Sequence, residues 1–281
     1  MIMNSKIFDK LSLEKDSLAI RKKILELSYK AGGGQHIGGG LSMVEIMCYL
    51  YGYKMDINKN NLKATDRDRF ILSKGHGVLG FYPVLNHYGL ISDELLKTYK
   101  QELSELISHP IKNLDNGIES SNGSLGHGLS YGLGIAHGLK LNKNKANVYV
   151  LIGDGECNEG SIWEAAMSAS SLKIDNLTLI IDFNKYQSDG STSEIINQNR
   201  LGDRWSSFGW NVIEIDGHDY DSIHNAFMKK RKENIPNLIL ANTIKGKGIS
   251  FMESNNEWHH GRLTENLFNK ALEALKNGSN T

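Results

Sequence analysis

The sequence predicts an α/β protein with a mainly parallel sheet and helices on both faces. Its main signal is a set of short, mostly continuous apolar runs that end in turn residues, as is typical of strands buried on both faces. They lie at residues 70–72, 148–152, 177–181, 212–215 and 238–241. Segments long enough for helices separate neighbouring runs, notably 161–172 and 220–230, which favours right-handed crossovers between parallel strands. Ligands of such sheets bind at the carboxyl ends of the strands.

The composition predicts one cytoplasmic domain with no role in nucleic-acid or membrane binding. The chain has 281 residues, enough for a sizeable core without disulfides. Lys plus Arg and Asp plus Glu both number 32, so no overall basic field attracts nucleic acid or an anionic membrane. The first twenty residues contain no signal-peptide core. Cys48 and Cys157 form no Cys-x-x-Cys pair and are expected to be reduced, and no linker divides residues 1–281.

The first predicted element is an amphipathic helix. Apolar residues recur at helical spacing at Leu13, Ile20, Ile24, Leu27 and Ala31. The helix is expected to end at the glycine run 32–34. After a second glycine cluster at 38–40, Ser42 and Glu45 match a capping box that would open an apolar helix through about Tyr51. Near the other end, residues 255–260 and the Lys/Asn-rich terminus are predicted to be a surface loop and a tail.

The glycine-rich run 126–138 is predicted to be a helix with a face of small residues. A dinucleotide-binding loop would need a strand before it, and residues 113–122 are polar. Gly128, Gly132 and Ala136 repeat every four residues and permit close packing. Packing against a partner chain is the favoured interpretation, and a contact within the domain is the alternative.

Two polar side chains directly follow two of the predicted strands. Asp154 lies between Gly153 and Gly155 after the run 148–152, and Asn184 follows the run 177–181. The intervening segment is long enough for one crossover helix and the next strand, so the two side chains can reach a shared point. Carboxylate and amide oxygens suit Mg²⁺ or Ca²⁺, and the glycines let the backbone approach a diphosphate. A Gly-Asp-Gly turn alone is weak evidence, but with Asn184 it predicts a metal-diphosphate site.

These residues resemble a known family. Residues 153–160 (GDGECNEG), followed by 182–184 (DFN), resemble the thiamine-diphosphate motif, and the Glu159-Gly160 ending looks most like transketolases. Four further segments resemble transketolase loops in the expected order, at residues 35–38, 69–77, 108–110 and 123–128. The match covers roughly residues 15–261. It implies the thiamine-diphosphate-binding fold, in the form of the domain that binds the diphosphate (the PP-type domain).

The resemblance also implies site residues. The metal would be held by Asp154, Asn184 and the main-chain carbonyl of Tyr186. The cofactor-binding set that it implies is His76, Gly123, Leu125, Gly153, Asp154, Gly155, Glu156, Asn184 and His260. The catalytic set that it implies is His36, His109, His260, Glu159 and Glu164.

Some of these roles have alternatives. His36 and His109 would line the sugar channel, and His259 competes with His260 for the position near the diphosphate. Glu159 and Glu164 match glutamates that relay protons between the two cofactors of a dimer, but they can also be solvated helix carboxylates. The remaining candidates are expected to be structural histidines: His87, His137, His218 and His224.

The chain departs from the family pattern on the substrate side. Ser124 and His127 replace a proline and a glutamine, and Ile111 follows His-Pro where the family has glutamate. These changes leave the cofactor site plausible and leave open whether the substrate is an ordinary sugar phosphate.

The resemblance predicts half of a two-chain enzyme. Transketolases move a two-carbon ketol unit from a ketose or ketose phosphate to an aldose, and a glutamate of a second, pyrimidine-binding domain activates the cofactor. The chain ends at Thr281, where that domain would begin, so an α2β2 heterotetramer with a C-terminal partner subunit is expected. The alternatives are another thiamine-diphosphate enzyme subunit, either of the 2-oxo-acid dehydrogenase α type or a specialised ketol transferase, and a non-catalytic scaffold.

Overall fold

The computed structural model describes residues 7–278 and contains a five-stranded parallel sheet of order β1-β2-β3-β7-β6. The strands are β1 (Arg69–Leu72), β2 (Val148–Gly153), β3 (Leu177–Phe183), β6 (Asn211–Asp216) and β7 (Asn237–Asn242). All five predicted strands are confirmed. The side chains of β6 are mostly half-buried or exposed because it is an edge strand, so the expectation of burial on both faces fails there.

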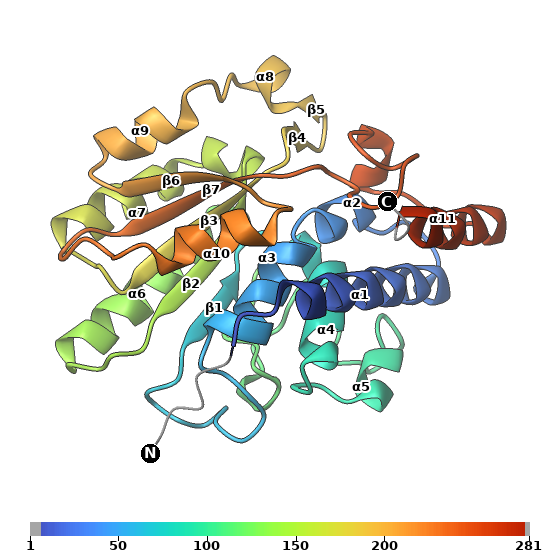
Figure 1. Cartoon of the computed structure of the whole chain (residues 1–281), viewed down its shortest axis with the longest axis horizontal. Helices are drawn as coiled ribbons and strands as arrows, with labels where there is room; N and C mark the ends of the chain where they lie inside the picture. Colours follow the sequence, from blue (N-terminus) through green and yellow to red (C-terminus); the bar gives the residue numbers. More distant parts are fainter. Residues whose placement is uncertain (1–6, 279–281) are drawn as a thin grey trace.

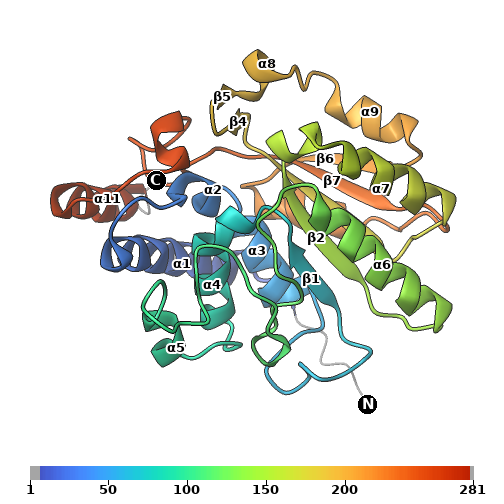
Figure 2. The same ribbon diagram turned by 180° about the vertical axis from the view of Figure 1, so that it is seen from behind.

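Helices cover both faces of the sheet, as predicted (Figures 1 and 2). Their bounds are α1 (Lys10–Ala31), α2 (Ile37–Leu41), α3 (Val44–Tyr49), α4 (Val78–His87), α5 (Asp93–Lys97), α6 (His127–Leu141), α7 (Gly160–Ser171), α8 (Thr192–Ile195), α9 (Leu201–Ser207), α10 (Tyr220–Met228) and α11 (Glu265–Gly278). A short hairpin, β4 (Tyr186–Gln187) and β5 (Gly190–Ser191), precedes α8.

Alternate strand residues enter two separate cores. Tyr149 and Leu151 of β2 pack with α1, α3 and α4, whereas Val150 and Ile152 pack with α6 and α7. This alternation is the period-two geometry of a strand, and apolar residues at every position let β2 bury both faces. The carboxyl ends of the strands are thereby fixed between two helical layers.

The predicted capping box at Ser42 is wrong. The glycines at 38–40 lie inside α2 rather than in a loop, and α3 follows after a break at Ser42 and Met43. The Ser42 hydroxyl donates to Asp182 at 2.6 Å, and Glu45 is buried in an ion pair with Arg21 at 2.7 Å. Both side chains are therefore used in contacts distant in sequence instead of capping a helix.

The C-terminal predictions also need correction. Residues 256–259 form a 3₁₀ turn whose Trp258 is buried, so this segment is more than a surface loop. The expected tail is the helix α11, which packs beside α1 with Ala271 and Leu275 buried (Figure 1). Its apolar residues repeat at helical spacing among polar ones, a pattern that composition alone concealed.

The small-residue face of α6 contacts the sheet. An added Cβ would lie 2.3 Å from the Ser73 hydroxyl at Gly128 and 2.4 Å from Val150 Cγ2 at Gly132. The favoured partner contact at this face is therefore wrong, and the contact within the domain is confirmed. Gly134 and Gly138 point to open space on the other side of the helix.

Candidate active site

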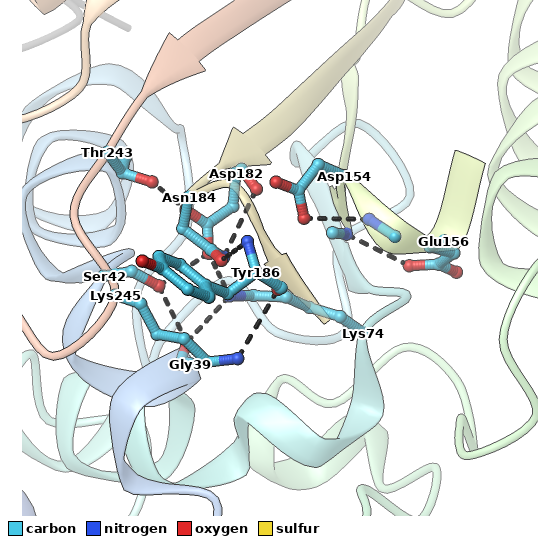
Figure 3. A network of polar contacts seen from close by, with 12 residues as sticks. Gly39, Ser42, Lys74, Asp154, Glu156, Asp182, Asn184, Tyr186, Thr243 and Lys245 are labelled. Atoms are coloured by element: carbon cyan, nitrogen blue, oxygen red, sulfur yellow. Dashed lines mark hydrogen bonds and ion pairs between the residues drawn. The ribbon is translucent and has the colours of Figure 1, made fainter. Parts of the chain in front are cut away.

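The carboxyl ends of β2 and β3 bring Asp154 and Asn184 together in one cavity of about 460 Å³ (Figure 3). The register pairs Gly153 with Asp182, and the Asp154 N–H donates to the Asp182 carbonyl at 3.3 Å. Asp154 and Asn184 are both buried. The sequence-based expectation that these two side chains share a site is confirmed by this geometry.

The predicted metal ligands present oxygen atoms that accept hydrogen bonds, from main-chain donors at Asp154 and Asn184 and from a lysine side chain at the Tyr186 carbonyl. Asp154 accepts from the N–H groups of Gly155 at 2.8 Å and Lys185 at 2.5 Å. The Asn184 amide oxygen accepts from the Tyr186 N–H at 3.1 Å, and the Tyr186 carbonyl accepts from Lys245 at 3.4 Å. Residues 7–278 contain no cluster of three or more His, Cys, Asp or Glu suited to a metal. A cation here would therefore depend on the amide and the main-chain carbonyl as much as on the acid.

Charge makes this donor set a good fit for a divalent cation. Burial, followed by the neighbouring Asp182, raises the pKa of Asp154 to about 7. A buried carboxylate with a raised pKa is stabilised in its ionised form when a cation binds beside it. The hard oxygens match the preference of Mg²⁺.

Asp182 is the fully buried centre of a network that the sequence reasoning missed. Its carboxylate pairs with Lys74 and accepts from Thr243, Ser42 at 2.6 Å and Asn184 at 3.1 Å. Burial acts to raise the pKa of Asp182, but the Lys74 charge and these hydrogen bonds outweigh it, so the pKa is lowered. The network holds Asn184 in place, and the position of Asp182 two residues before Asn184 was the available signal.

Glu156 lies in the cavity wall but its oxygens are already used. They accept from the Ser73 hydroxyl and from the N–H groups of Gly126 at 2.9 Å and Gly153 at 3.2 Å. The side chain therefore fixes the glycine turn beside α6 against the end of β2. Gly123 and Leu125 also line the cavity, as the resemblance implies for a cofactor-contacting turn.

Four histidines line the cavity: His36, His76, His109 and His259. The Nδ1 of His259 lies 2.7 Å from Lys245 Nζ. His260 is exposed, and its ring packs against that of His36 with centroids 4.7 Å apart. Of the two competitors, His259 thus faces the cavity and His260 supports its rim.

The cavity histidines are poised to be neutral. Burial, followed by His260 and other nearby charges, lowers the pKa of His36 to about 4. Burial and Lys245 lower the pKa of His259 to about 3, and burial also lowers the pKa of His76 and of His109. A neutral imidazole has one donor and one acceptor nitrogen, so each ring can either donate a hydrogen bond to a hydroxyl or accept one from it.

The two candidate glutamates differ in placement. Glu159 is exposed and lines the cavity rim, whereas Glu164 is exposed on α7 and is not part of the lining. Three other histidines have structural contacts: His87 with Asp16 at 2.9 Å, His218 with Glu45 at 3.0 Å, and His224 stacked on Phe8. His137 lies on α6 outside the cavity lining.

The cavity has further walls that the sequence did not indicate. Lys245 follows β7, and a segment after Asn184 lines another part of the cavity. That segment contributes Gln187, Ser188, Asp189, Ile195 and Ile196. A lysine in a Gly-rich turn after a predicted strand was a usable signal for Lys245; the segment after Asn184 has no comparable motif.

We expect His36 to lower the stability of the chain as the pH falls. The pKa of His36 is near 6.5 in the unfolded chain and about 4 in the folded chain. Between these pH values His36 is protonated in the unfolded state and neutral in the folded state, so protonation stabilises the unfolded state. Its contribution is full above pH 6.5 and declines toward pH 4. His36→Gln should therefore lose less stability than the parent between pH 7 and pH 5 in urea unfolding. His137→Gln is the control; equal losses in H36Q and the parent would contradict the assignment.

A parallel sheet with a buried acid and amide at neighbouring strand ends, flanked by glycine turns, defines an α/β domain with a candidate site for a metal and a diphosphate. The family model described as "Transketolase, thiamine diphosphate binding domain" matches residues 16–277. The chain therefore belongs to the transketolase family as its thiamine-diphosphate-binding domain, and the resemblance and fold drawn from the motifs are confirmed.

Individual relatives agree. The chain is 42% identical over 262 residues to one subunit of an apulose-4-phosphate transketolase of Phocaeicola vulgatus, covering 93% of this chain and 92% of that protein. It is 41% identical to one subunit of a 6-deoxy-6-sulfo-D-fructose transketolase of a Clostridium species, covering 95% and 97%. The solved transketolase of Campylobacter jejuni superposes with a TM-score of 0.88 at 30% identity, covering 96% of this chain and 43% of that one. The chain thus spans less than half of that solved transketolase.

Proposed function

We propose that this chain is the thiamine-diphosphate- and Mg²⁺-binding subunit of a two-chain transketolase. The observation that carries the proposal is the convergence of Asp154, Asn184 and the Tyr186 carbonyl at one end of a cavity whose other walls carry neutral histidines. When bound, thiamine diphosphate supplies the carbanion chemistry of ketol transfer. The protein supplies binding, orientation and proton positions.

At the inner end of the cavity, Asp154, Asn184 and the Tyr186 carbonyl would hold the metal. The glycines at 153 and 155 would let the main chain approach the diphosphate, and His76 and His259 would donate hydrogen bonds to it. The Lys245 ammonium lies 3.4 Å from the Tyr186 carbonyl and would offset part of the diphosphate charge. His260 would act through the ring of His36.

At the sugar end, His36 and His109 would bind hydroxyl groups. Because both have lowered pKa values, they can accept as well as donate a proton near neutral pH. This polar wall suits a polyol better than the small 2-oxo acid of a dehydrogenase. The two relatives named above take sugars whose names contain a phosphate or a sulfo group. We therefore extend the proposal to a ketose donor with an anionic end and an aldose acceptor.

In this proposal the chain is catalytically active only with a second subunit. Relatives of nearly the same length are named as single subunits of transketolases, and the solved transketolases are more than twice as long. We infer a pyrimidine-binding C-terminal subunit, an α2β2 assembly, and proton relay through Glu159 and Glu164 across it. A cytoplasmic location belongs to the same proposal. Cys48 and Cys157 are both free and buried. No helix within residues 7–278 is both long and apolar enough to cross a membrane.

We expect the chain to turn over substrate only with its partner. The test is to purify the chain alone and together with the candidate C-terminal subunit, and to measure ketol transfer with thiamine diphosphate and Mg²⁺ over a panel of ketose phosphates, free ketoses and 2-oxo acids. The complex should transfer ketol units and each chain alone should not. Full activity of the isolated chain would refute the two-chain proposal, and activity on 2-oxo acids alone would favour the dehydrogenase alternative.

A further inference from the structure

The turn after β7 (residues 243–247, the β7 turn) carries two side chains of the candidate site. Thr243 donates to Asp182, the buried centre of the polar network. Lys245 lines the cavity, and its ammonium lies 2.7 Å from His259 Nδ1. The main chain of the β7 turn therefore sets the position of a cation inside the cavity.

Three almost completely buried side chains hold the main chain of the β7 turn from outside the cavity. His218 Nε2 accepts from the Ile244 N–H at 2.8 Å. Arg21 Nε donates to the Lys247 carbonyl at 2.9 Å. The two side chains meet at Glu45, whose carboxylate lies 3.0 Å from His218 Nδ1 and 2.7 Å from Arg21. None of the three lines the cavity. The turn is thus fixed on each side of its central lysine by α1, α3 and the loop after β6.

The hydrogen bonds of His218 determine which ring nitrogen carries the proton. The Ile244 N–H can only donate, so Nε2 must present its lone pair and Nδ1 must carry the hydrogen that is donated to Glu45. Burial acts to raise the pKa of Glu45, but the charge of Arg21 and the bond from His218 outweigh it, so the pKa is lowered. The ionised Glu45 therefore orients the ring, and the ring presents an acceptor to the main chain.

We propose that His218 is a positioning residue for Lys245. By accepting from the Ile244 N–H, it fixes the main chain directly before Lys245 and so directs the ammonium toward the Tyr186 carbonyl, at the end of the cavity where the diphosphate would bind. The inference rests on the proposed binding of thiamine diphosphate, because that function gives a cation at this place its use. Removing a group that orients a metal ligand costs about 10–100-fold in affinity, and a cation that must face a diphosphate depends on its support in the same way.

Two substitutions of His218 separate its two hydrogen bonds. Glutamine extends its amide to the region of Nε2, so His218→Gln keeps an acceptor for the Ile244 N–H and loses the bond to Glu45. Asparagine places its amide in the region of Nδ1, so His218→Asn keeps a donor for Glu45 and loses the main-chain bond. If His218 positions Lys245, H218N should be the damaging variant. If His218 only compensates the buried charge of Glu45, H218Q should be.

The first measurement is isothermal calorimetry of thiamine diphosphate binding to the full chain with Mg²⁺, at a temperature where circular dichroism shows the variants to be folded. H218N should weaken the affinity by about tenfold or more, and H218Q should stay within about threefold of the parent. His137→Asn, on α6 outside the cavity lining, is the matched control and should bind as the parent does. Loss of affinity in folded H218Q would overturn the proposal, whether or not H218N folds.

A double-substitution cycle tests whether the effect passes through Lys245. Lys245→Met removes the cation, so adding H218N to K245M should change the affinity by less than about twofold. A purely structural role of His218 would weaken binding to K245M by the same factor as binding to the parent. Such additivity would overturn the route through Lys245.

A second measurement uses the full chain without ligand, so it does not depend on the proposed function. NMR hydrogen exchange follows the Ile244 N–H, and the ring signals of His259 report the position of Lys245. H218N should speed exchange of this N–H and shift the His259 signals, whereas H218Q should change neither. Unchanged His259 signals in H218N would contradict the proposal. If the parent binds no thiamine diphosphate, the proposed function fails, and this measurement still decides whether His218 positions Lys245.

Discussion

Asp154→Ala should abolish metal-dependent binding of thiamine diphosphate, with an affinity loss of about 100-fold or more. The carboxylate is the charged member of the proposed ligand set, alongside an amide and a main-chain carbonyl. Changes to the groups that orient metal ligands already cost about 10–100-fold in affinity, so removing a charged ligand should cost at least as much. Isothermal calorimetry with thiamine diphosphate, in the presence and absence of Mg²⁺, measures this directly.

Two further variants separate binding from folding. Asp154→Asn keeps the size of the side chain and one acceptor oxygen, so it can still accept from one of the Gly155 and Lys185 N–H groups, which bond different oxygens of Asp154, yet it lacks the charge that a cation requires. We expect it to remain folded in the absence of urea and to bind no cofactor through Mg²⁺. Asp66→Asn, at an exposed position, is the control. If D154N bound thiamine diphosphate as tightly as the parent, the metal assignment would be wrong.

The part of the fold that the sequence predicted is the part determined by short-range pattern. Apolar runs located all five sheet strands. Four of them are buried on both faces and need apolar residues at nearly every position, and the edge strand β6 still carries Val212, Ile213 and Ile215. The Ser42 capping box failed because the hydroxyl is taken by Asp182, 140 positions along the chain. Local sequence cannot report a competitor at that distance. The helix α11 is different, because its apolar residues Leu267, Phe268, Ala271, Leu272 and Leu275 repeat at helical spacing and the sequence alone was enough to predict it.

The sequence likewise predicted the part of the candidate site that depends on strand ends, and not the part that depends on tertiary packing. Asp154 and Asn184 could be found because parallel strands place their carboxyl ends at one edge, a rule that needs no tertiary detail. The choice between His259 and His260 could not be made, since a 3₁₀ turn with buried Trp258 decides which ring faces inward. The burial of Lys74 could not be predicted from the sequence. Lysines are almost never fully buried unless they are paired, and the partner of Lys74 is 108 positions away.

Lys74→Met should destabilise the chain by about 3–5 kcal/mol, because it leaves the Asp182 charge buried without its cation. Lys74 is 1% exposed and Asp182 0%. The ammonium also donates to the Gly39 carbonyl at 2.7 Å, which would lose that partner. Urea unfolding of K74M measures the loss. The matched control is Lys63→Met, whose pair with Asp115 is 87% and 76% exposed and should contribute nothing measurable.

The double variant K74M/D182N identifies the cause. If the cost of K74M comes from the uncompensated charge, removing that charge should recover about 0.5–3 kcal/mol relative to K74M alone. If the cost comes instead from lost packing of the lysine stem, the two substitutions should simply add. Asp182 also accepts from Asn184, so either single variant should weaken metal-dependent cofactor binding as well as stability. A K74M protein of parental stability would show that Ser42, Thr243 and Asn184 suffice to hold the buried carboxylate.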